Sequence, residues 1–475
     1  MRRALAAAVF LVALGASAGP PLPPVLPLST SPFPWRAFKL WGPPSDRAIR
    51  EQTEFFVGLG FNSIWIYSHE AGRWDPVSAR RGPFLDPAFL DLATWCRERG
   101  VRMLVSVNPS SDAGGRFVFG TRDGERRIRR FFALLRRAGV RDFVLSFDDL
   151  PVELRDLRDI LRYGRSAAPA HLDLARRIAR HLRRGDRLWL CASAYCDAHL
   201  ADGRGPYAAT FLAGLPSLPP DVGIVWTGSA PISPAIPADG IRSTRARLGG
   251  REILLYDNFA PIEGGEDAIA AYLGPLRDRD PGLASDIAIY MACPLYGPGA
   301  SRLSMLTVAD WLADPAGYEA DAAWRKAIAR LAGPDRDAAE ALRVQTLEWR
   351  GWDAGARFRP WDPVDPEEAA ATLDDPALAA EWSWTVARYP ARIEALAGLE
   401  DEPFRESVVD LMERRLAIAR AVAPAIEYRA RKRAGREDLE PLLEELRRQR
   451  AAVSGKPAVL RVLDRFLEEA EIPVP

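Results

Sequence analysis

The sequence predicts a (β/α)8 barrel followed by an all-α C-terminal domain, and three observations predict this fold. From Trp35 to about Asp314, short apolar runs alternate with amphipathic segments. The apolar runs number eight, which is the number of strands in such a barrel. After Asp314 the strand-like runs disappear, and the remaining sequence has helical periodicity.

The eight apolar runs are typical of strands that are covered on both faces, because Val, Ile, Leu and Phe fill them almost continuously. They are Ala37–Gly42, Ser63–Ser68, Arg102–Asn108, Asp142–Asp148, Arg187–Tyr195, Gly223–Gly228, Glu252–Asn258 and Asp286–Pro294. An open doubly wound sheet is the alternative, but no Gly-x-Gly-x-x-Gly motif follows any of these runs.

The segments between the strands predict helices. Asp86–Arg99 and Arg126–Arg137 each place apolar residues on one side, and the second places arginines opposite them. These arginines could bind a polyanion, but we interpret them as a solvated helix face. Gly60, Gly100 and Gly139 each follow a helix directly and are expected to end it.

We expect the barrel to occupy residues 35–318 and the helical domain residues 319–475. Four amphipathic segments support the second domain, namely Glu367–Leu373, Leu378–Tyr389, Glu406–Ala421 and Asp438–Ala452. The Arg- and Glu-rich stretch from Ala430 to Arg450 is interpreted as an exposed, ion-paired helix.

The first residues have the pattern of a secretory signal peptide over 1–18. Arg2 and Arg3 precede an apolar stretch, and Ala16-Ser17-Ala18 offers a small-x-small cleavage site. An uncleaved anchor is the alternative, but the stretch is shorter than the roughly 20 residues that span a bilayer. Residues 19–34 form a Pro-rich linker. We therefore expect a secreted or periplasmic protein without stable membrane insertion.

Composition limits the possible partners. The chain of 475 residues has 64 basic and 64 acidic residues, which argues against a nucleic-acid partner. Four cysteines are too few for a disulfide scaffold, and we expect them to be buried thiols. With four histidines and no metal-ligand spacing, neither a metal site nor another cofactor is expected. The oligomeric state is not predicted.

Polar and aromatic residues follow the apolar part of four consecutive strands. In the barrel fold, catalytic groups lie at the carboxyl ends of the strands. The four strand ends are Asp148-Asp149, Ala194-Tyr195, Trp226-Thr227-Gly228 and Tyr256-Asp257-Asn258. The sequence therefore predicts an active site at this end of the barrel.

The adjacent residues Asp148 and Asp149 are the most specific indication of function among these strand ends. Two adjacent carboxylates over a barrel of low dielectric constant cannot both ionise freely, so we expect one pKa to rise. Glycoside hydrolysis needs such a division between an acid and a charged partner. Alternatively, the two aspartates could cap a helix N-terminus or bind a cation, but their place at a strand end favours a catalytic role.

Several motifs together resemble family-84 glycoside hydrolases, the β-N-acetylglucosaminidases that include O-GlcNAcase. The resemblance covers roughly Trp35 to Trp324 and rests on the order and spacing of the motifs. They are Phe143-Val144-Leu145-Ser146-Phe147-Asp148-Asp149-Leu150, Ala194-Tyr195-Cys196, Ile224-Val225-Trp226-Thr227-Gly228, Tyr256-Asp257-Asn258 and Thr307-Val308-Ala309-Asp310-Trp311.

The resemblance implies a retaining, substrate-assisted mechanism in which the 2-acetamido group of the substrate forms an oxazoline. It implies that Asp148 stabilises the acetamido N–H and that Asp149 is the general acid and base. It gives Tyr195 and Asn258 contacts with the acetamido group. The remaining substrate-binding residues would be Gly42, Trp226, Tyr256, Glu263 and Cys293, with Glu263 on the 4- and 6-hydroxyls and Trp226 and Tyr256 as walls.

Three departures from the family pattern affect sugar binding. The first strand ends in Lys39-Leu40-Trp41-Gly42-Pro43-Pro44, the lysine after the second strand is replaced by Tyr67-Ser68-His69-Glu70, and Cys293 stands where the family has Asn. Glu70 or His69 could substitute for the lysine. A glycan or glycoconjugate substrate is expected. A non-catalytic glycan-binding protein, or a hydrolase of another 2-acetamido sugar or of a uronic-acid polymer, stays open.

Overall fold

The computed structural model describes residues 31–73, 82–109, 117–259, 272–294, 299–349, 376–436, 438–452, 463–464 and 466–467. Glu263 and the signal peptide therefore lie outside the described residues, as do most of the Pro-rich linker and the segment Glu367–Leu373. Within the described residues, no helix is long and apolar enough to cross a bilayer.

Eight parallel strands of the described chain close into a barrel, which confirms the predicted fold and excludes the open sheet. Their order around the barrel is β1-β10-β9-β8-β7-β6-β5-β2. The strands are β1 (Arg36–Lys39), β2 (Ser63–Tyr67), β5 (Arg102–Val107), β6 (Asp142–Ser146), β7 (Arg187–Cys191), β8 (Gly223–Trp226), β9 (Ile253–Asp257) and β10 (Ile289–Ala292). The sequence did not predict the hairpin of β3 (Gly72–Arg73) and β4 (Phe84–Leu85).

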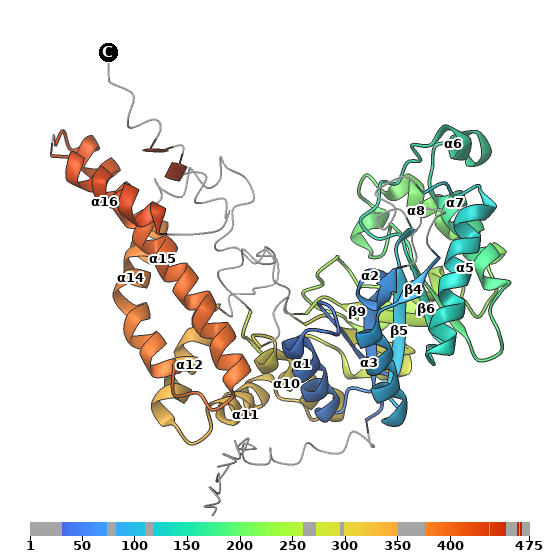
Figure 1. Cartoon of the computed structure of the whole chain (residues 1–475), viewed down its shortest axis with the longest axis horizontal. Coiled ribbons are helices and arrows are strands. Elements are labelled where there is room, and N and C mark those ends of the chain that lie inside the picture. Colours follow the sequence, from blue (N-terminus) through green and yellow to red (C-terminus); the bar gives the residue numbers. More distant parts are fainter. Residues whose placement is uncertain are drawn as a thin grey trace, which may run out of the picture.

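Helices surround the barrel (Figure 1). They are α1 (Arg47–Gly58), α2 (Ser68–Ala71), α3 (Pro87–Glu98), α5 (Arg122–Arg137), α6 (Leu157–Tyr163), α7 (Ala168–Ala179), α8 (Gly205–Gly214), α9 (Ala238–Arg247) and α10 (Arg302–Ala313). Asp86 caps α3, because its side chain accepts a hydrogen bond from the amide of Ala88. Gly60, Gly100 and Gly139 take positive φ angles of 96°, 67° and 98° after their helices, as expected.

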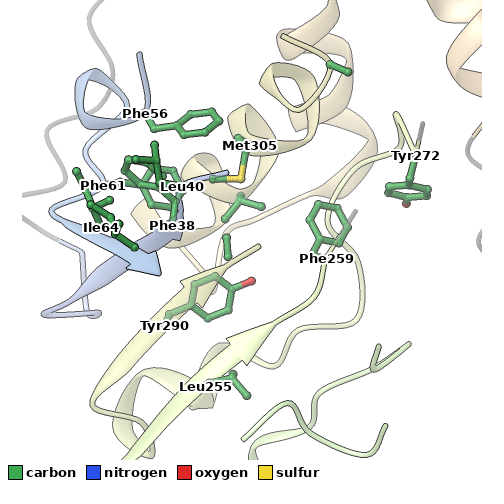
Figure 2. Close-up of a cluster of buried hydrophobic side chains, with 14 of the residues drawn as sticks. Phe38, Leu40, Phe56, Phe61, Ile64, Leu255, Phe259, Tyr272, Tyr290 and Met305 are labelled. Carbon is green, nitrogen blue, oxygen red and sulfur yellow. The ribbon is translucent and has the colours of Figure 1, made fainter. Parts of the chain in front are cut away.

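The main hydrophobic core lies between the barrel strands and the surrounding helices. Phe38 of β1 packs edge-on against Phe56 of α1, with ring centroids 5.0 Å apart, and against Phe61 at 5.8 Å. Figure 2 shows these rings beside Ile64 of β2. These aromatic contacts pack α1 against β1.

The helices after the barrel lie to one side of it (Figure 1). They are α11 (Ala320–Ala332), α12 (Arg336–Trp349), α14 (Pro376–Leu396), α15 (Glu402–Arg433) and α16 (Glu440–Ala451). A buried ion pair joins the two parts, because Arg302 of α10 contacts Asp401, the N-cap of α15, at 2.7 Å. The helical C-terminal region is thus confirmed, while the domain boundaries at 35–318 and 319–475 stay predictions.

Candidate active site

Strand alternation determines which side chains face the barrel axis. A second, smaller buried cluster fills the barrel interior and includes Trp65 of β2, Val144 of β6, Cys191 of β7 and Leu254 of β9. Residues two positions further along each strand face the same way, one layer nearer the carboxyl ends. These inward positions include Lys39, Tyr67, Ser146, Thr227, Tyr256 and Cys293, while Asp148 and Asn258 follow the ends of β6 and β9.

Asp148 is half-buried and follows the end of β6. Burial raises the pKa values of Tyr67 and Tyr256, and the charge of Asp148 raises both further. Because Tyr67 ends β2 and Tyr256 lies in β9, the Asp148 carboxylate is within electrostatic reach of strands on different sides of the barrel.

Asp149 is exposed and points toward the loop after β7. Its backbone takes a φ of 55°, a left-handed conformation that costs a non-glycine residue about 1–3 kcal/mol and is typical of functional sites. The hydroxyl of Tyr195 donates a hydrogen bond to Asp149 at 2.8 Å. Burial, followed by the Asp149 charge, raises the pKa of Tyr195, so this phenol stays a donor at neutral pH.

Both carboxylates are within electrostatic reach of Cys191. Burial raises the pKa of the Cys191 thiol, and the charges of both Asp148 and Asp149 raise it further. Cys191 pairs with Ser146 in the β6–β7 register, directly below the acidic pair. The structure therefore brings Asp148, Asp149 and Tyr195 together, while the division into an acid and a charged partner stays a prediction.

A buried network of hydrogen bonds and ring stacking holds Phe147, the residue that directly precedes the acidic pair. The amide of Phe147 donates to the carbonyl of Cys191 at 2.8 Å, and its carbonyl accepts from Ser193 Oγ at 2.7 Å. The Phe147 ring stacks on His171 of α7 with centroids 3.9 Å apart. His171 Nδ1 in turn contacts the hydroxyl of Tyr207 at 2.9 Å. These contacts fix the backbone from which both aspartates extend.

We expect His171 to make stability depend on pH. Burial lowers its pKa from 6.5 to about 3. Between these values the unfolded chain binds a proton that the folded chain does not, so stability is lost as pH falls. The loss should be about 2 kcal/mol between about pH 7 and about pH 5. Urea unfolding of His171→Gln should show a pH dependence smaller by that amount, and an unchanged dependence would contradict this assignment.

Tyr256, Asn258 and Cys293 form the opposite side of the site. The Tyr256 hydroxyl donates to the Cys293 sulfur at 3.4 Å, and its ring packs edge-on against Trp65 at 5.4 Å. Asn258 Nδ2 donates to the carbonyl of Pro231 at 2.8 Å. Tyr256 and Cys293 therefore belong to the inner layer, and Asn258 is tied to the loop after β8.

Asp257, which lies between Tyr256 and Asn258, points outward and holds the end of β9. It forms a bidentate ion pair with Arg279 at 2.7 and 2.9 Å and accepts a hydrogen bond from Tyr290 at 2.6 Å. Both partners of the ion pair are buried. The pair is a structural support for the strand that presents Tyr256 and Asn258.

The corner near Gly42 differs from the sequence-based expectation. Glu70 accepts hydrogen bonds from Lys39 Nζ at 3.0 Å, from the amide of Gly42 at 2.8 Å and from the amide of Tyr67 at 2.9 Å. Gly42 has a φ of 116°, which favours glycine. Glu70 therefore ties three strand-end groups together, and its oxygens are engaged by the protein itself.

Lys39 was missed as a site residue. Its buried ammonium lies 3.9 Å from the ring centre of Tyr67 and 4.7 Å from that of Trp41. Burial lowers its pKa, and the charge of Glu70 opposes this shift. The signal in the sequence was a charged residue at an inward position of an otherwise apolar strand. His69, the other suggested substitute for the family lysine, is exposed and stacks on Tyr67.

Trp226 is not brought to this group. It is 2% exposed and belongs to the core between strands and helices, whereas its neighbour Val225 faces the barrel interior. Together, the carboxyl ends of the strands and the loops that follow them offer two carboxylates, a phenol donor beside one of them, and aromatic side chains. Such an arrangement suits general acid–base chemistry on a polar ring. No group that could hold a metal ion occurs among the described residues.

Comparisons with known proteins agree on one family. A family model described as β-N-acetylglucosaminidase matches residues 87–346, which is more than half of the chain. The protein O-GlcNAcases of Rattus norvegicus and Mus musculus are each 21% identical over 225 residues. These matches cover 47% of this chain and 23% of the relatives, so the chain spans about a quarter of their length.

Solved structures show the same fold. A mutant of the O-GlcNAc hydrolase of Thermobaculum terrenum superposes with a TM-score of 0.62 and 18% identity, covering 92% of this chain and 94% of that one. The structure of CpGH84B gives a TM-score of 0.58 with 17% identity and covers 93% of this chain and 77% of that one. The likeness therefore extends through the barrel into the helical region.

Proposed function

The chain belongs to the β-N-acetylglucosaminidase family of glycoside hydrolases, and on that premise we propose that it is an exported, retaining β-N-acetylglucosaminidase that uses substrate-assisted catalysis. The observation that carries the proposal is the acidic pair at the carboxyl end of β6. The Asp148 carboxylate is within electrostatic reach of Tyr67 and Tyr256, and Asp149 accepts the Tyr195 hydrogen bond beside it. A glycan or glycoconjugate is the substrate.

In the proposed reaction the substrate supplies the nucleophile. The acetamido oxygen attacks the anomeric carbon while the glycosidic bond breaks, and Asp148 accepts a hydrogen bond from the acetamido N–H. Asp149 gives its proton to the leaving oxygen. It then takes a proton from the water that opens the oxazoline, which restores the acid and yields the sugar with retained configuration.

The other residues position the sugar. Tyr195, whose hydroxyl reaches Asp149 in the free protein, exchanges this hydrogen bond for the acetamido oxygen when substrate binds. Asn258 contacts the same group, Tyr256 and Cys293 form the wall opposite Asp148, and Gly42 allows close approach at the corner. Glu263 as the ligand of the sugar hydroxyls is part of the same proposal, whereas Trp226, which lies in the core between strands and helices, is not.

The N-terminal pattern supports export. Residues 1–18 contain a charged start, an apolar stretch and a small-x-small site, which together are typical of a cleaved signal peptide. We propose that the mature protein is secreted or periplasmic and that residues 19–34 are a linker. The N-terminal sequence of protein recovered from the culture medium or periplasm should then begin near Gly19.

A non-catalytic glycan-binding protein is the second candidate, and the corner near Gly42 favours it. The Glu70 oxygens bind Lys39 and two backbone amides, so this corner offers no carboxylate to a sugar hydroxyl. A binding protein would hold the sugar without cleaving it. A hydrolase of another 2-acetamido sugar, or of a uronic-acid polymer, would cleave a different substrate at the same acidic pair.

Two matched aryl glycosides separate these candidates. The proposed enzyme should release the phenol from aryl N-acetyl-β-glucosaminide but not from the aryl β-glucoside, because only the first carries the acetamido nucleophile. Equal turnover of both would contradict substrate assistance. Binding of the first without turnover would favour the glycan-binding protein, and turnover of a different 2-acetamido sugar or of a polyuronate alone would redirect the substrate assignment.

A further inference from the structure

A strong excess of positive charge lies on one side of the barrel. The whole chain is neutral, yet residues 122–142 and 173–187 together contain 14 arginines against five acidic residues. These two segments contain α5 and most of α7 with the loops that follow them. An excess of nine charges in 36 residues creates a local field that attracts anions.

The arginines that cause this charge excess surround a groove between α5 and α7. The groove has a volume of about 350 Å³, and its walls carry Arg126, Arg129, Arg130, Arg136, His181 and Arg183. No acidic side chain is among its lining residues. Phe132 and Ile178, which are 2% and 1% exposed, form part of an apolar floor. The groove therefore joins a hydrophobic base to cationic walls.

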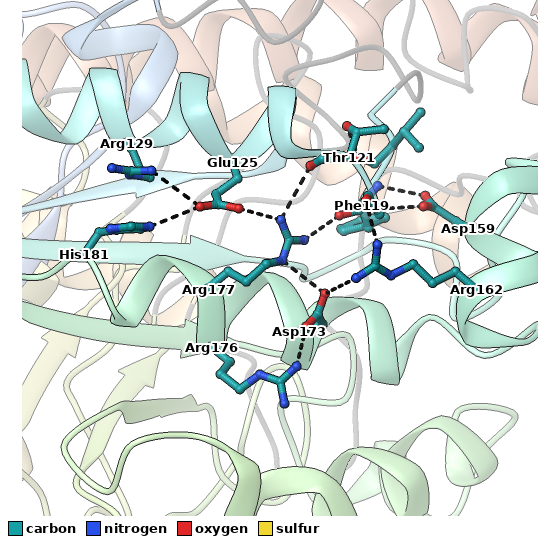
Figure 3. A network of polar contacts seen from close by, with 12 residues as sticks. Phe119, Thr121, Glu125, Arg129, Asp159, Arg162, Asp173, Arg176, Arg177 and His181 are labelled. Atoms are coloured by element: carbon teal, nitrogen blue, oxygen red, sulfur yellow. Dashed lines mark hydrogen bonds and ion pairs between the residues drawn. The ribbon is translucent and has the colours of Figure 1, made fainter.

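Glu125, the acid beside the groove, is shared among three basic groups. It contacts Arg177 at 2.9 Å, His181 at 3.2 Å and Arg129 at 3.7 Å, as Figure 3 shows. One carboxylate cannot neutralise the two guanidinium groups among these partners, so positive charge remains beside the groove.

Two further acids, Asp173 and Asp186, are outnumbered in the same way. Asp173 contacts Arg176 at 2.5 Å, Arg177 at 3.1 Å and Arg162 at 3.7 Å. Asp186 contacts Arg136 at 2.6 Å and Arg141 at 3.9 Å. The internal ion pairs therefore position the arginines without cancelling their charge.

Three groove arginines are available to a ligand. The Arg126 side chain is 58% exposed and meets Asp123 only at 3.9 Å. Arg130 and Arg183 are exposed, and within the part of the chain that the structure describes their side chains form no ion pair. An exposed guanidinium presents a planar fork that matches a carboxylate or sulfate.

We propose that the groove between α5 and α7 is a second binding site, which holds an acidic glycan chain through its carboxylate or sulfate groups. A recessed groove fits a chain better than the flat surface of a bilayer. The aromatic ring among its lining residues is buried, so the groove lacks the exposed stacking platform of a single-stranded nucleic-acid site.

The groove is remote from the acidic pair. Arg136 and Arg183 precede β6 and β7, so they lie near the amino ends of these strands, whereas Asp148 follows the carboxyl end of β6. The groove would therefore hold an acidic polymer outside the catalytic cleft. It does not depend on the proposed hydrolase activity.

Binding of the full chain to polygalacturonate and heparin tests the proposal, with neutral dextran as the uncharged comparison. Both acidic polymers should bind, and affinity should fall between about 50 mM and about 200 mM NaCl. The triple variant Arg126→Gln, Arg130→Gln and Arg183→Gln should bind about tenfold more weakly. Its turnover of a small aryl glycoside should equal that of the wild type.

A matched variant separates the groove from net charge. Arg245→Gln, Arg325→Gln and Arg388→Gln remove the same formal charge elsewhere and should leave affinity unchanged. Wild-type affinity in the groove variant, equal losses in both variants, or equal binding of dextran would overturn the site. Tighter binding to vesicles of anionic phospholipid or to an oligonucleotide would overturn the choice of an acidic glycan.

Discussion

Replacing Asp149 by asparagine is expected to lower kcat for an aryl N-acetyl-β-glucosaminide by about 10²–10⁴-fold, the usual contribution of a general acid–base group. The change keeps the size of the side chain and an acceptor for Tyr195, so the site geometry should survive. It removes the proton that the leaving oxygen requires. The loss in kcat/KM should therefore grow as the pKa of the leaving phenol increases, which a series of substituted phenols measures.

The matched control is Asp91→Asn, on the exposed face of α3. It also replaces one carboxylate by an amide and should leave kcat and KM unchanged. Asp148→Asn should reduce kcat for every leaving group alike, because Asp148 assists the acetamido nucleophile rather than the departing phenol. Turnover by Asp149→Asn at the wild-type rate would remove this residue from the mechanism.

Replacing Asp257 by alanine is expected to have the largest effect on stability, about 3–5 kcal/mol of unfolding free energy. The change leaves the Arg279 guanidinium buried without its carboxylate and takes the acceptor from Tyr290. Burial lowers the pKa of Arg279 and the Asp257 charge more than restores it, so the guanidinium remains charged in the folded protein. Urea unfolding at neutral pH measures the loss.

Asp310→Ala is the matched surface variant. It also breaks an ion pair, in this case with Lys326 at 2.8 Å, but the Lys326 side chain is 65% exposed. The expected loss is about 0–1 kcal/mol, because water already solvates both groups. Equal losses in the two variants would show that the Asp257 pair does not support β9 as we describe.

The barrel could be predicted because its signal is local. A strand covered on both faces must be apolar along its whole length, so β5, with the sequence RMLVSV, stands out without knowledge of its neighbours. The predicted positions of the strand ends were less accurate. The run Arg187–Tyr195 ends as a strand at Cys191, and the residues beyond it, which include Tyr195, leave the sheet at the site. Helix α5 begins at Arg122, four residues before the predicted start.

The contacts between strand ends could not be predicted, because they depend on closure of the barrel. Lys39 and Glu70 are 31 positions apart and meet only since β1 and β2 are neighbours. Alternation would have placed Trp226 on the outer face, since Val225 and Trp226 cannot both face the axis. The pairing of Tyr195 with Asp149 likewise needs the neighbouring strands β6 and β7 in register.

Calorimetric titration with a thiazoline that mimics the oxazoline gives the most direct test of the account. If Asp148 holds the cyclised acetamido group, the wild type should bind the thiazoline at least about 100-fold more tightly than N-acetylglucosamine, as expected of a mimic of a reactive species. Asp148→Asn should lose most of that preference. Equal affinity of the wild type for the thiazoline and for the free sugar would contradict a catalytic role of the pair.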